Sequence, residues 1–344
     1  MGVGLSYAEV GLLKPSYPTI GQTFYVVDHD YRTAAQGWSR ADRTGPLDLY
    51  EARKAGQGGV QYVFRTSDYS APADRSTIQA AIDQAVDFRG DTVFLTPGSY
   101  SIATTALDLN VANMRFLGPQ TPAGTYGARS QVTLTDAIGV NTISADNIEV
   151  GFMKFIPLTA LDFWNASAGA DSGYFHDYFY DVRGIAASTA TIFMDLVGGT
   201  NDYWVFKNFW QTTDEAQGPH LDIGDEVNDL LVEDFLLSHG GGTTLAVALF
   251  DNTSANADGG IVIRRGKGYT RGAASTAVTN LGKLTDTGAD VMSVSIEDFT
   301  GSVGFCASNA LVDLNGAETA EIGLYRNYLM TISGGTGLGT VYTA

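Results

Sequence analysis

Val227–Leu236, with the sequence VNDLLVEDFL, is the stretch that decides the fold, because its pattern recurs along the chain. Two apolar residues alternate at Leu230 and Val232, two polar residues follow, and an aromatic residue, Phe235, comes next. Alternation with a period of two is typical of a β-strand. We place the ends of the copies at positions 155, 178, 209, 235, 266, 299 and 328, with the weakest copy ending in Gly266. A period of roughly 20 to 50 residues predicts a solenoid.

A second strand pattern, apolar–Asp–apolar, lies about fourteen residues before most of these aromatic ends, and turn residues separate the two patterns. Its copies are Leu107–Leu109, Leu161–Phe163, Met194–Leu196, Leu221–Ile223 and Val312–Leu314. Gly, Thr, Asn and Asp fill the repeats, where a helical solenoid would need strong helix formers. Each repeat is therefore strand, turn, strand, corner and a return of variable length. Such units bury their apolar side only by stacking, which predicts an all-β parallel β-helix.

Composition limits the partners. The chain has 344 residues, 44% hydrophobic and 17% charged, with 41 glycines, as expected for a folded, turn-rich β protein. A net charge of −18 argues against binding to nucleic acid or to an anionic membrane surface. The first fifteen residues have neither a basic start nor a long apolar run. We therefore expect no secretion signal and no membrane anchor.

Three regions are predicted along the chain. Residues 1–72 form an extended arm and a small α+β attachment region, which includes a short helix at Pro46–Lys54. Residues 73–333 form the solenoid. An amphipathic helix at Asp74–Val86, with an apolar stripe that includes Ile78 and Ile82, caps its open end. Residues 334–344 are a short glycine-rich tail.

The cap helix and the strand after it resemble a known family. Thr77–Ile82 (TIQAAI), followed by Asp91–Tyr100 (DTVFLTPGSY), is similar to the start of pectate-lyase-like β-helices. The resemblance covers roughly residues 74–331 and implies a right-handed solenoid. It says little about activity, because this fold hosts lyases, hydrolases, epimerases, phage tailspikes and virion coat components. A shorter stretch, Gly21–Asp28, is similar to the beginning of phage virion proteins that carry such a β-helix.

Three aspartates are the candidate site residues. The middle residue of apolar–Asp–apolar points outward, so Asp162, Asp195 and Asp222 would stack about 4.8 Å apart on successive coils. Retaining glycosidases hold two carboxyl groups about 5–5.5 Å apart, and such a stack could also bind a divalent cation. The competing interpretation is a structural column, because Asp108 and Asp313 occupy the same place in their repeats. We favour the structural interpretation and predict no catalytic residue, cofactor or metal, keeping the three aspartates as candidates if the protein is an enzyme.

A polysaccharide lyase would need a cationic base beside its acidic residues. The basic residues nearest the strand patterns are Arg264, Arg265 and Arg326, several coils away from the middle aspartates. The four histidines show no metal-ligand spacing. The sequence therefore gives little support to a lyase site.

The resemblance favours a non-enzymatic virion protein of a tailed phage. We expect a homotrimeric capsid decoration or cement protein whose arm, residues 1–72, binds the major capsid protein or another virion protein. It would be made in the host cytoplasm, not secreted, and would lie on the capsid surface rather than the tail. The alternative is a carbohydrate-active β-helix, either a short tailspike depolymerase, a glycoside hydrolase or a polysaccharide lyase. A non-catalytic sugar-binding module is a third interpretation.

Overall fold

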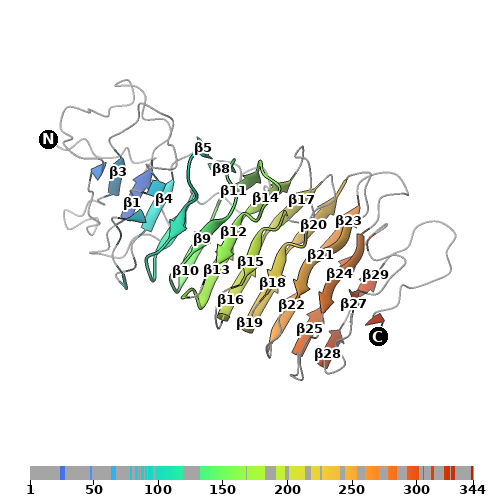
Figure 1. The fold of residues 1–344 in the computed structure, drawn as a ribbon. Helices are drawn as coiled ribbons and strands as arrows, with labels where there is room; N and C mark the ends of the chain where they lie inside the picture. The colour runs from blue at the N-terminus through green and yellow to red at the C-terminus, as the bar shows by residue number, and fades with distance from the viewer. Residues whose placement is uncertain are drawn as a thin grey trace, which may run out of the picture.

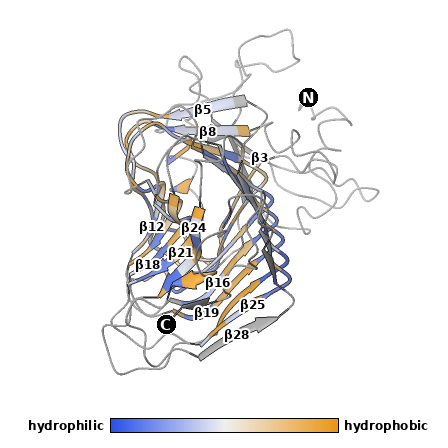
Figure 2. Ribbon diagram, turned by 90° about the vertical axis from the view of Figure 1, so that its right-hand side faces the viewer, coloured by the Kyte–Doolittle hydropathy of each residue, from blue (hydrophilic) through white to orange (hydrophobic). Residues whose placement is uncertain are grey.

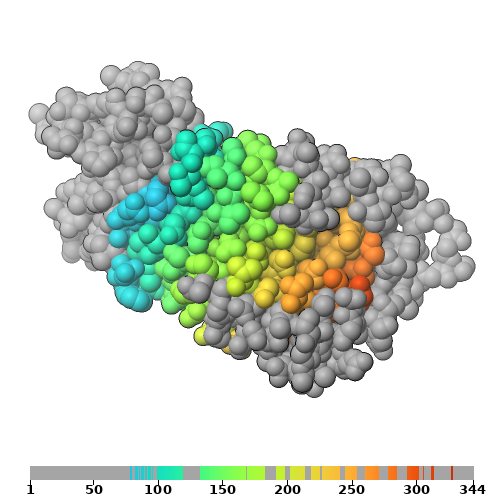
Figure 3. Space-filling view, in the orientation of Figure 1, coloured from blue at the N-terminus to red at the C-terminus, as the bar shows by residue number. Residues whose placement is uncertain are grey.

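The structure is a computed structural model that describes residues 78–329 with gaps, and outside this range only four short strands. The longer gaps are 119–131, 183–190, 214–217, 241–244, 254–259, 271–277, 285–292, 306–310 and 314–320. The described coils stack along one axis, and their strands lie side by side from β4 to β28 (Figure 1). The regular progression of colour along the surface shows the same order of coils (Figure 3).

Three sheets form the faces of a right-handed parallel β-helix, which confirms the predicted fold class. Sheet 1 contains β2 (Leu47–Asp48), β3 (Val63–Thr66), β1 (Phe24–Val27), β4 (Thr92–Leu95), β7 (Arg115–Leu117), β10 (Ile148–Gly151), β13 (Ser172–His176), β16 (Asn201–Lys207), β19 (Val227–Glu233), β22 (Ile261–Arg264), β25 (Ser293–Glu297) and β28 (Glu321–Tyr325). Every described pair in the three sheets is parallel except β2 with β3.

Sheet 2 follows sheet 1 in each coil, and sheet 3 follows sheet 2. Sheet 2 contains β5 (Gly98–Ile102), β8 (Val132–Asp136), β11 (Lys154–Pro157), β14 (Phe179–Val182), β17 (Trp210–Thr213), β20 (Leu236–His239), β23 (Lys267–Thr270), β26 (Thr300–Gly301) and β29 (Tyr328–Leu329). Sheet 3 contains β6 (Asp108–Leu109), β9 (Asn141–Ile143), β12 (Trp164–Ala166), β15 (Met194–Leu196), β18 (Leu221–Ile223), β21 (Leu245–Asn252), β24 (Val278–Leu284), β27 (Val312–Asp313) and β30 (Tyr342–Thr343).

The aromatic ends of the repeat stack inside the solenoid. Tyr178, Phe209 and Phe235 are buried, with ring centroids 5.0 and 5.5 Å apart in successive pairs. The next coil has Gly266 at this position, where an added Cβ would lie 2.1 Å from the ring of Phe235. Phe235 fills this space and reaches Phe299 two coils away, at 6.1 Å. At the weak copy of the repeat, the ring of Phe235 therefore fills the interior position of its own coil and that of the next coil.

The corner between sheets 1 and 2 repeats one backbone conformation. The residue before each inward-facing position has a left-handed backbone, with φ between 52° and 60°. These residues are Phe152, Asp177, Asn208, Asp234, Arg265 and Asp298. Asn and Asp tolerate this conformation better than most residues, which explains the polar pair before each aromatic. The corner amides of Asp177, Asn208 and Asp234 donate hydrogen bonds to carbonyls of the next coil, so the ladder continues around the bend.

Two repeats were placed in the wrong register by the sequence pattern. In the last one, Thr300 pairs with Tyr328, so the residue equivalent to Phe299 is Asn327 and not Tyr328. The other is the copy that ends at Phe155. Val150 pairs with Phe175, so the residue equivalent to Tyr178 is Met153 and not Phe155. Phe155 lies in sheet 2, opposite Tyr180. Alternating apolar residues on both sides of this corner made either choice compatible with a strand.

A helical turn covers the N-terminal end of the solenoid, as predicted. Residues 78, 79 and 82 are helical, and Ile78 and Ile82 are fully buried. The side chain of Gln79 pairs with the edge strand β6: its amide nitrogen donates to the carbonyl of Asp108 at 3.0 Å, and its oxygen accepts from the Asp108 amide at 2.8 Å. The helix therefore closes both the apolar interior and part of a sheet edge.

Most of the predicted arm, residues 1–72, lies outside the described residues, as does most of the tail, 334–344. Within the arm, Leu47–Asp48 is the strand β2, whereas the sequence predicted a helix there. Strand β1 lies between β3 and β4, so the described strands of the arm extend sheet 1. No helix in the part of the chain that the structure describes is long and apolar enough to cross a membrane.

Candidate active site

Three carboxyl groups stand in register on the outer face of sheet 3. Asp195 of β15 pairs with Asp222 of β18, which pairs with Asp251 of β21. Met194, Leu196, Leu221 and Ile223, the neighbours of the first two, are fully buried. Because successive side chains of a strand alternate, this burial turns the aspartates outward. We call Asp195, Asp222 and Asp251 the aspartate row.

The row differs from the predicted one at both ends. Asp162 does not stand in the column, because β12 begins at Trp164 and places Asn165 opposite Asp195. Leu161–Phe163 imitates the strand pattern, but Leu161 is 44% exposed and it is Trp164 and Ala166 that face the interior. Asp162 nevertheless reaches the row from the preceding loop, where its carboxyl group hydrogen-bonds that of Asp195.

Asp251 was missed by the sequence analysis. The residue after it, Asn252, occupies an interior position that the pattern reserves for an apolar side chain, and it is completely buried. The pair Leu249-Phe250 before Asp251 was the one available signal. The predicted candidates Asp195 and Asp222 are thus in register, Asp162 joins them from a loop, and Asp251 extends the row.

Burial and like charge raise the pKa values of this group. The pKa of Asp195 is raised to about 7, first by burial and then by Asp162 and Asp222. Burial raises the pKa of Asp222 to about 6, with Asp251 and Asp162 contributing, and burial likewise raises that of Asp162 to about 6. The Oδ1 atoms of Asp195, Asp222 and Asp251 are buried and accept no hydrogen bond.

The hydrogen bond between Asp162 and Asp195 requires a proton on one of the two carboxyl groups. Burial raises the pKa of both groups, to about 7 at Asp195 and to about 6 at Asp162, so the pair retains a proton up to near neutral pH. The opposite end of the row is different. Lys283, in register with Asp251, lies with Nζ 3.6 Å from its Oδ2 and holds back the rise that burial causes in the pKa of Asp251. The row therefore favours a protonated group at Asp195 and an ionised group at Asp251.

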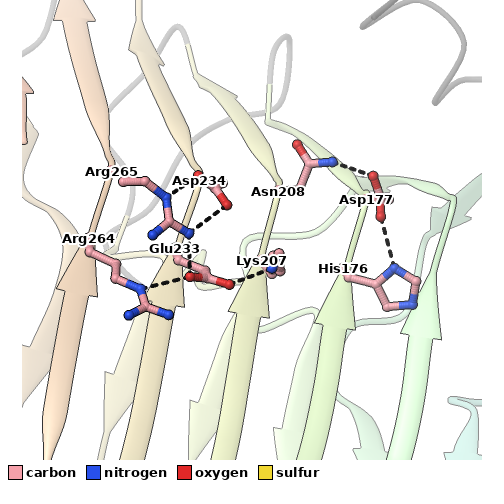
Figure 4. Close-up of polar contacts among 8 residues, drawn as sticks. All are labelled: His176, Asp177, Lys207, Asn208, Glu233, Asp234, Arg264 and Arg265. Atoms are coloured by element: carbon pink, nitrogen blue, oxygen red, sulfur yellow. Dashed lines mark hydrogen bonds and ion pairs between the residues drawn. The ribbon is translucent and has the colours of Figure 1, made fainter. Parts of the chain in front are cut away.

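A second polar group runs along the corner of sheets 1 and 2 (Figure 4). It contains His176, Asp177, Lys207, Asn208, Glu233, Asp234, Arg264 and Arg265, and we call it the corner ladder. The carboxylate of Glu233 forms ion pairs with Nζ of Lys207 at 2.6 Å and with Nε of Arg264 at 2.8 Å, and it also pairs with Arg265. Although burial opposes it, these three cations lower the pKa of Glu233 to about 2. Hydrophilic residues line the outer corner beside sheet 1 (Figure 2).

The corner ladder does not supply a base to the aspartate row. Arg264 and Arg265, which the sequence analysis considered for a lyase, bind Glu233 and Asp234 on another face of the solenoid. Arg326 lies outside the described residues. Among the described residues, no group of three or more His, Cys, Asp or Glu side chains is arranged to hold a metal ion.

Solved structures with a similar fold are known, but no match assigns this chain to a protein family. No protein family and no curated protein matches the sequence. The fold is similar to pectin methylesterase PemA from Erwinia chrysanthemi, with a TM-score of 0.49 and 10% identity over 95% of this chain and 94% of that chain. It is also similar to a pectin methylesterase in complex with hexasaccharide VII, with a TM-score of 0.48 and 12% identity over 78% of this chain and 88% of that one.

These comparisons correct two predictions. The similar structures are pectin methylesterases, which are carbohydrate-active enzymes, and this contradicts the predicted non-enzymatic capsid decoration protein. The likeness agrees with the right-handed parallel β-helix fold, and it gives no support to a relationship to phage virion proteins. At 10–13% identity the likeness concerns the fold alone, so activity has to be argued from the side chains of this chain.

Proposed function

We propose that this protein is a carbohydrate-active enzyme that hydrolyses a polysaccharide bound on the outer face of sheet 3. The observation that carries the proposal is the aspartate row, in which Asp195 and Asp222 stand in register and the pKa of Asp195 is about 7. A glycosidase needs one protonated and one ionised carboxyl group on either side of the bond that it breaks. Separate pKa values within a pair of carboxyl groups are the usual sign of such a division.

The row assigns a role to each group. Asp195 donates its proton to the leaving oxygen, and Asp162 orients it through their hydrogen bond. Asp222 lies one strand away, about 4.8 Å along the sheet, close to the roughly 5–5.5 Å separation of retaining enzymes. Its carboxylate then attacks the sugar carbon to form a covalent intermediate. Water, deprotonated by Asp195, releases the sugar and restores both carboxyl groups.

Exposed apolar side chains border this face. Leu161, which is 44% exposed, precedes Asp162, and Val197, which is 42% exposed, follows β15 directly. Sugar rings present apolar C–H surfaces as well as hydroxyl groups, so such side chains suit a saccharide beside the row.

The test is hydrolysis of a panel of neutral and acidic polysaccharides, followed as new reducing ends. We expect Asp195→Asn and Asp222→Asn each to lower the rate by at least about 10²-fold, the usual contribution of a general acid. Asp313→Asn is the matched control, because Asp313 lies in the same column two coils beyond Asp251. Full activity in Asp195→Asn would refute the assignment. Binding without cleavage by the wild-type protein would indicate a sugar-binding module instead.

Homotrimeric assembly and a place in a virion stay predictions from the sequence. The mass of the protein in solution tests the first of them, independently of activity.

A further inference from the structure

His176 ends β13 at the corner of sheets 1 and 2, and its surroundings enclose it almost completely. The residue is 6% exposed. Tyr174 stacks on the imidazole ring with centroids 4.5 Å apart, and Phe152 of the preceding coil meets it edge-on at 4.9 Å. An added Cβ on Gly151 would lie 2.7 Å from Cε1 and Nε2, so glycine at 151 is what allows the ring to lie across β10.

Both ring nitrogens face carboxylates. Nδ1 lies 3.0 Å from Oδ2 of Asp177, and Nε2 lies 3.0 Å from Oε1 of Glu149. An ionised carboxylate only accepts hydrogen bonds, whereas a neutral imidazole has one donor and one acceptor nitrogen. Both contacts are satisfied together only when both nitrogens carry protons. The geometry therefore requires an imidazolium ion at this position.

The other charged groups near His176 do not remove the need for protons on both of its ring nitrogens. Arg115 of β7 binds the second oxygen of Glu149 at 3.1 Å, and the Asn208 amide donates to the second oxygen of Asp177. Lys207 of β16 is in register with His176, but its ammonium group binds Glu233 (Figure 4). Burial alone would lower the pKa of His176, but the hydrogen bonds and charges of Asp177 and Glu149 outweigh it and raise the pKa.

We propose that His176 is a proton-operated clamp that joins consecutive coils of the solenoid at this corner. In its protonated form it links Glu149 of β10 to Asp177 of its own coil, and Asn208 extends the link to the coil of β16. Loss of the proton removes the His176 donor from either Oε1 of Glu149 or Oδ2 of Asp177, while Arg115 and Asn208 keep the second oxygen of each. The corner then loosens, and Tyr174, which is 37% exposed, loses the charged ring on which it stacks. The clamp is independent of the proposed hydrolase activity, because it lies on another face.

The direct test is a nitrogen-15 NMR titration of the wild-type protein. We expect His176 at pH 6 to show two protonated ring nitrogens and to titrate above 6.5, its ordinary value. His220 is the internal control. It is fully buried, its Nε2 faces the Tyr178 hydroxyl at 2.7 Å, and burial lowers its pKa, so it should stay neutral. A singly protonated His176 at pH 6 would overturn the clamp.

Variants test the consequence for stability. A raised folded pKa contributes stability that is complete below about pH 6.5 and is lost as pH rises through the folded value. The melting temperature of the wild type should therefore fall between pH 6 and pH 9. Both His176→Gln and Glu149→Gln should reduce this fall, whereas Glu297→Gln, farther along sheet 1, should retain it. An unchanged pH dependence in both clamp variants would refute the proposal.

Discussion

The aspartate row and the corner ladder are built alike and behave in opposite ways. Both stack ionisable side chains on successive strands, at the spacing of a parallel sheet. In the corner ladder the signs alternate, with Lys207, Glu233 and Arg264 in consecutive positions. In the aspartate row three acids follow one another. The pKa of Glu233 is about 2, whereas that of Asp195 is about 7.

The two rows contribute differently to stability. Alternating signs satisfy every charge and stabilise the stack of coils. Like charges in register oppose ionisation and leave three buried oxygen atoms without a hydrogen bond. This unfavourable arrangement is the reason that we propose the aspartate row, and not the corner ladder, as the active site. Three substitutions test this contrast between the two rows.

Glu233→Gln should give the largest loss of stability. Glu233 has 5% of its side chain exposed, whereas Lys207, Arg264 and Arg265 have about 40% exposed and can turn toward water. We therefore expect a loss of about 2 kcal/mol in the free energy of unfolding, less than the roughly 3–5 kcal/mol of a fully buried pair. Urea denaturation at pH 7 measures it.

The pH dependence gives this prediction a second test. A lowered folded pKa contributes stability that is present above the ordinary value near 4.5 and is lost as pH falls toward 2. Glu233→Gln should lose that part of the acid sensitivity. Glu297→Gln, the next acid in the same column, is the control and should change stability by less than about 0.5 kcal/mol. Equal effects of the two substitutions would mean that the corner ladder contributes no more than scattered surface charge.

Asp195→Asn should have the opposite effect and increase the free energy of unfolding. The raised pKa means that the folded state binds a proton more tightly than the unfolded state, so stability falls as pH rises from about 4 to 7. The amide cannot ionise, and we expect a gain of about 1–2 kcal/mol at pH 8 and almost none at pH 4. Denaturation at both values measures it, with Asp313→Asn as the control. A destabilised Asp195→Asn at pH 8 would place Asp195 among the structural residues.

The sequence predicted the fold well because alternation of apolar residues sets it directly. Leu230 and Val232 face the interior as expected, and the polar pair before each aromatic forms the corner. The register failed where apolar residues occur on both sides of a corner, as at Phe152–Phe155. The local sequence does not show which of two alternating sets of side chains faces the interior, because pairing with the neighbouring coil determines it.

The site was predicted in part for the same reason. Asp195 and Asp222 lie between apolar neighbours, and their register followed from the repeat. Asp162 carries the same local pattern but lies in a loop, and Asp251 lacks it because Asn252 is buried. The functional interpretation was wrong because it relied on a resemblance of the fold, and the raised pKa values appear only when the coils are stacked.

Lys283→Met should have the smallest effect and tests the polarity of the row. Lys283 lowers the pKa of Asp251, so its removal lets that pKa rise and leaves Asp251 protonated over a wider range. Lys283 also lowers the pKa of Asp222, so its removal raises that pKa directly, while the weaker repulsion from a protonated Asp251 lowers it. If Asp222 is the nucleophile, these effects oppose each other and the acid limb of kcat/KM should move by less than about one unit.

The matched control for this substitution is Lys154→Met. Lys154 pairs with Asp181 at 2.7 Å on sheet 2, so its loss removes an ion pair of the same kind away from the row. Its pH profile should coincide with that of the wild type. A shift of more than about one unit toward higher pH in Lys283→Met would instead make Asp251 the group that must be ionised, because Lys283 both pairs with Asp251 and is the main cause that lowers its pKa. The size of the shift thus decides which carboxylate of the row attacks the substrate.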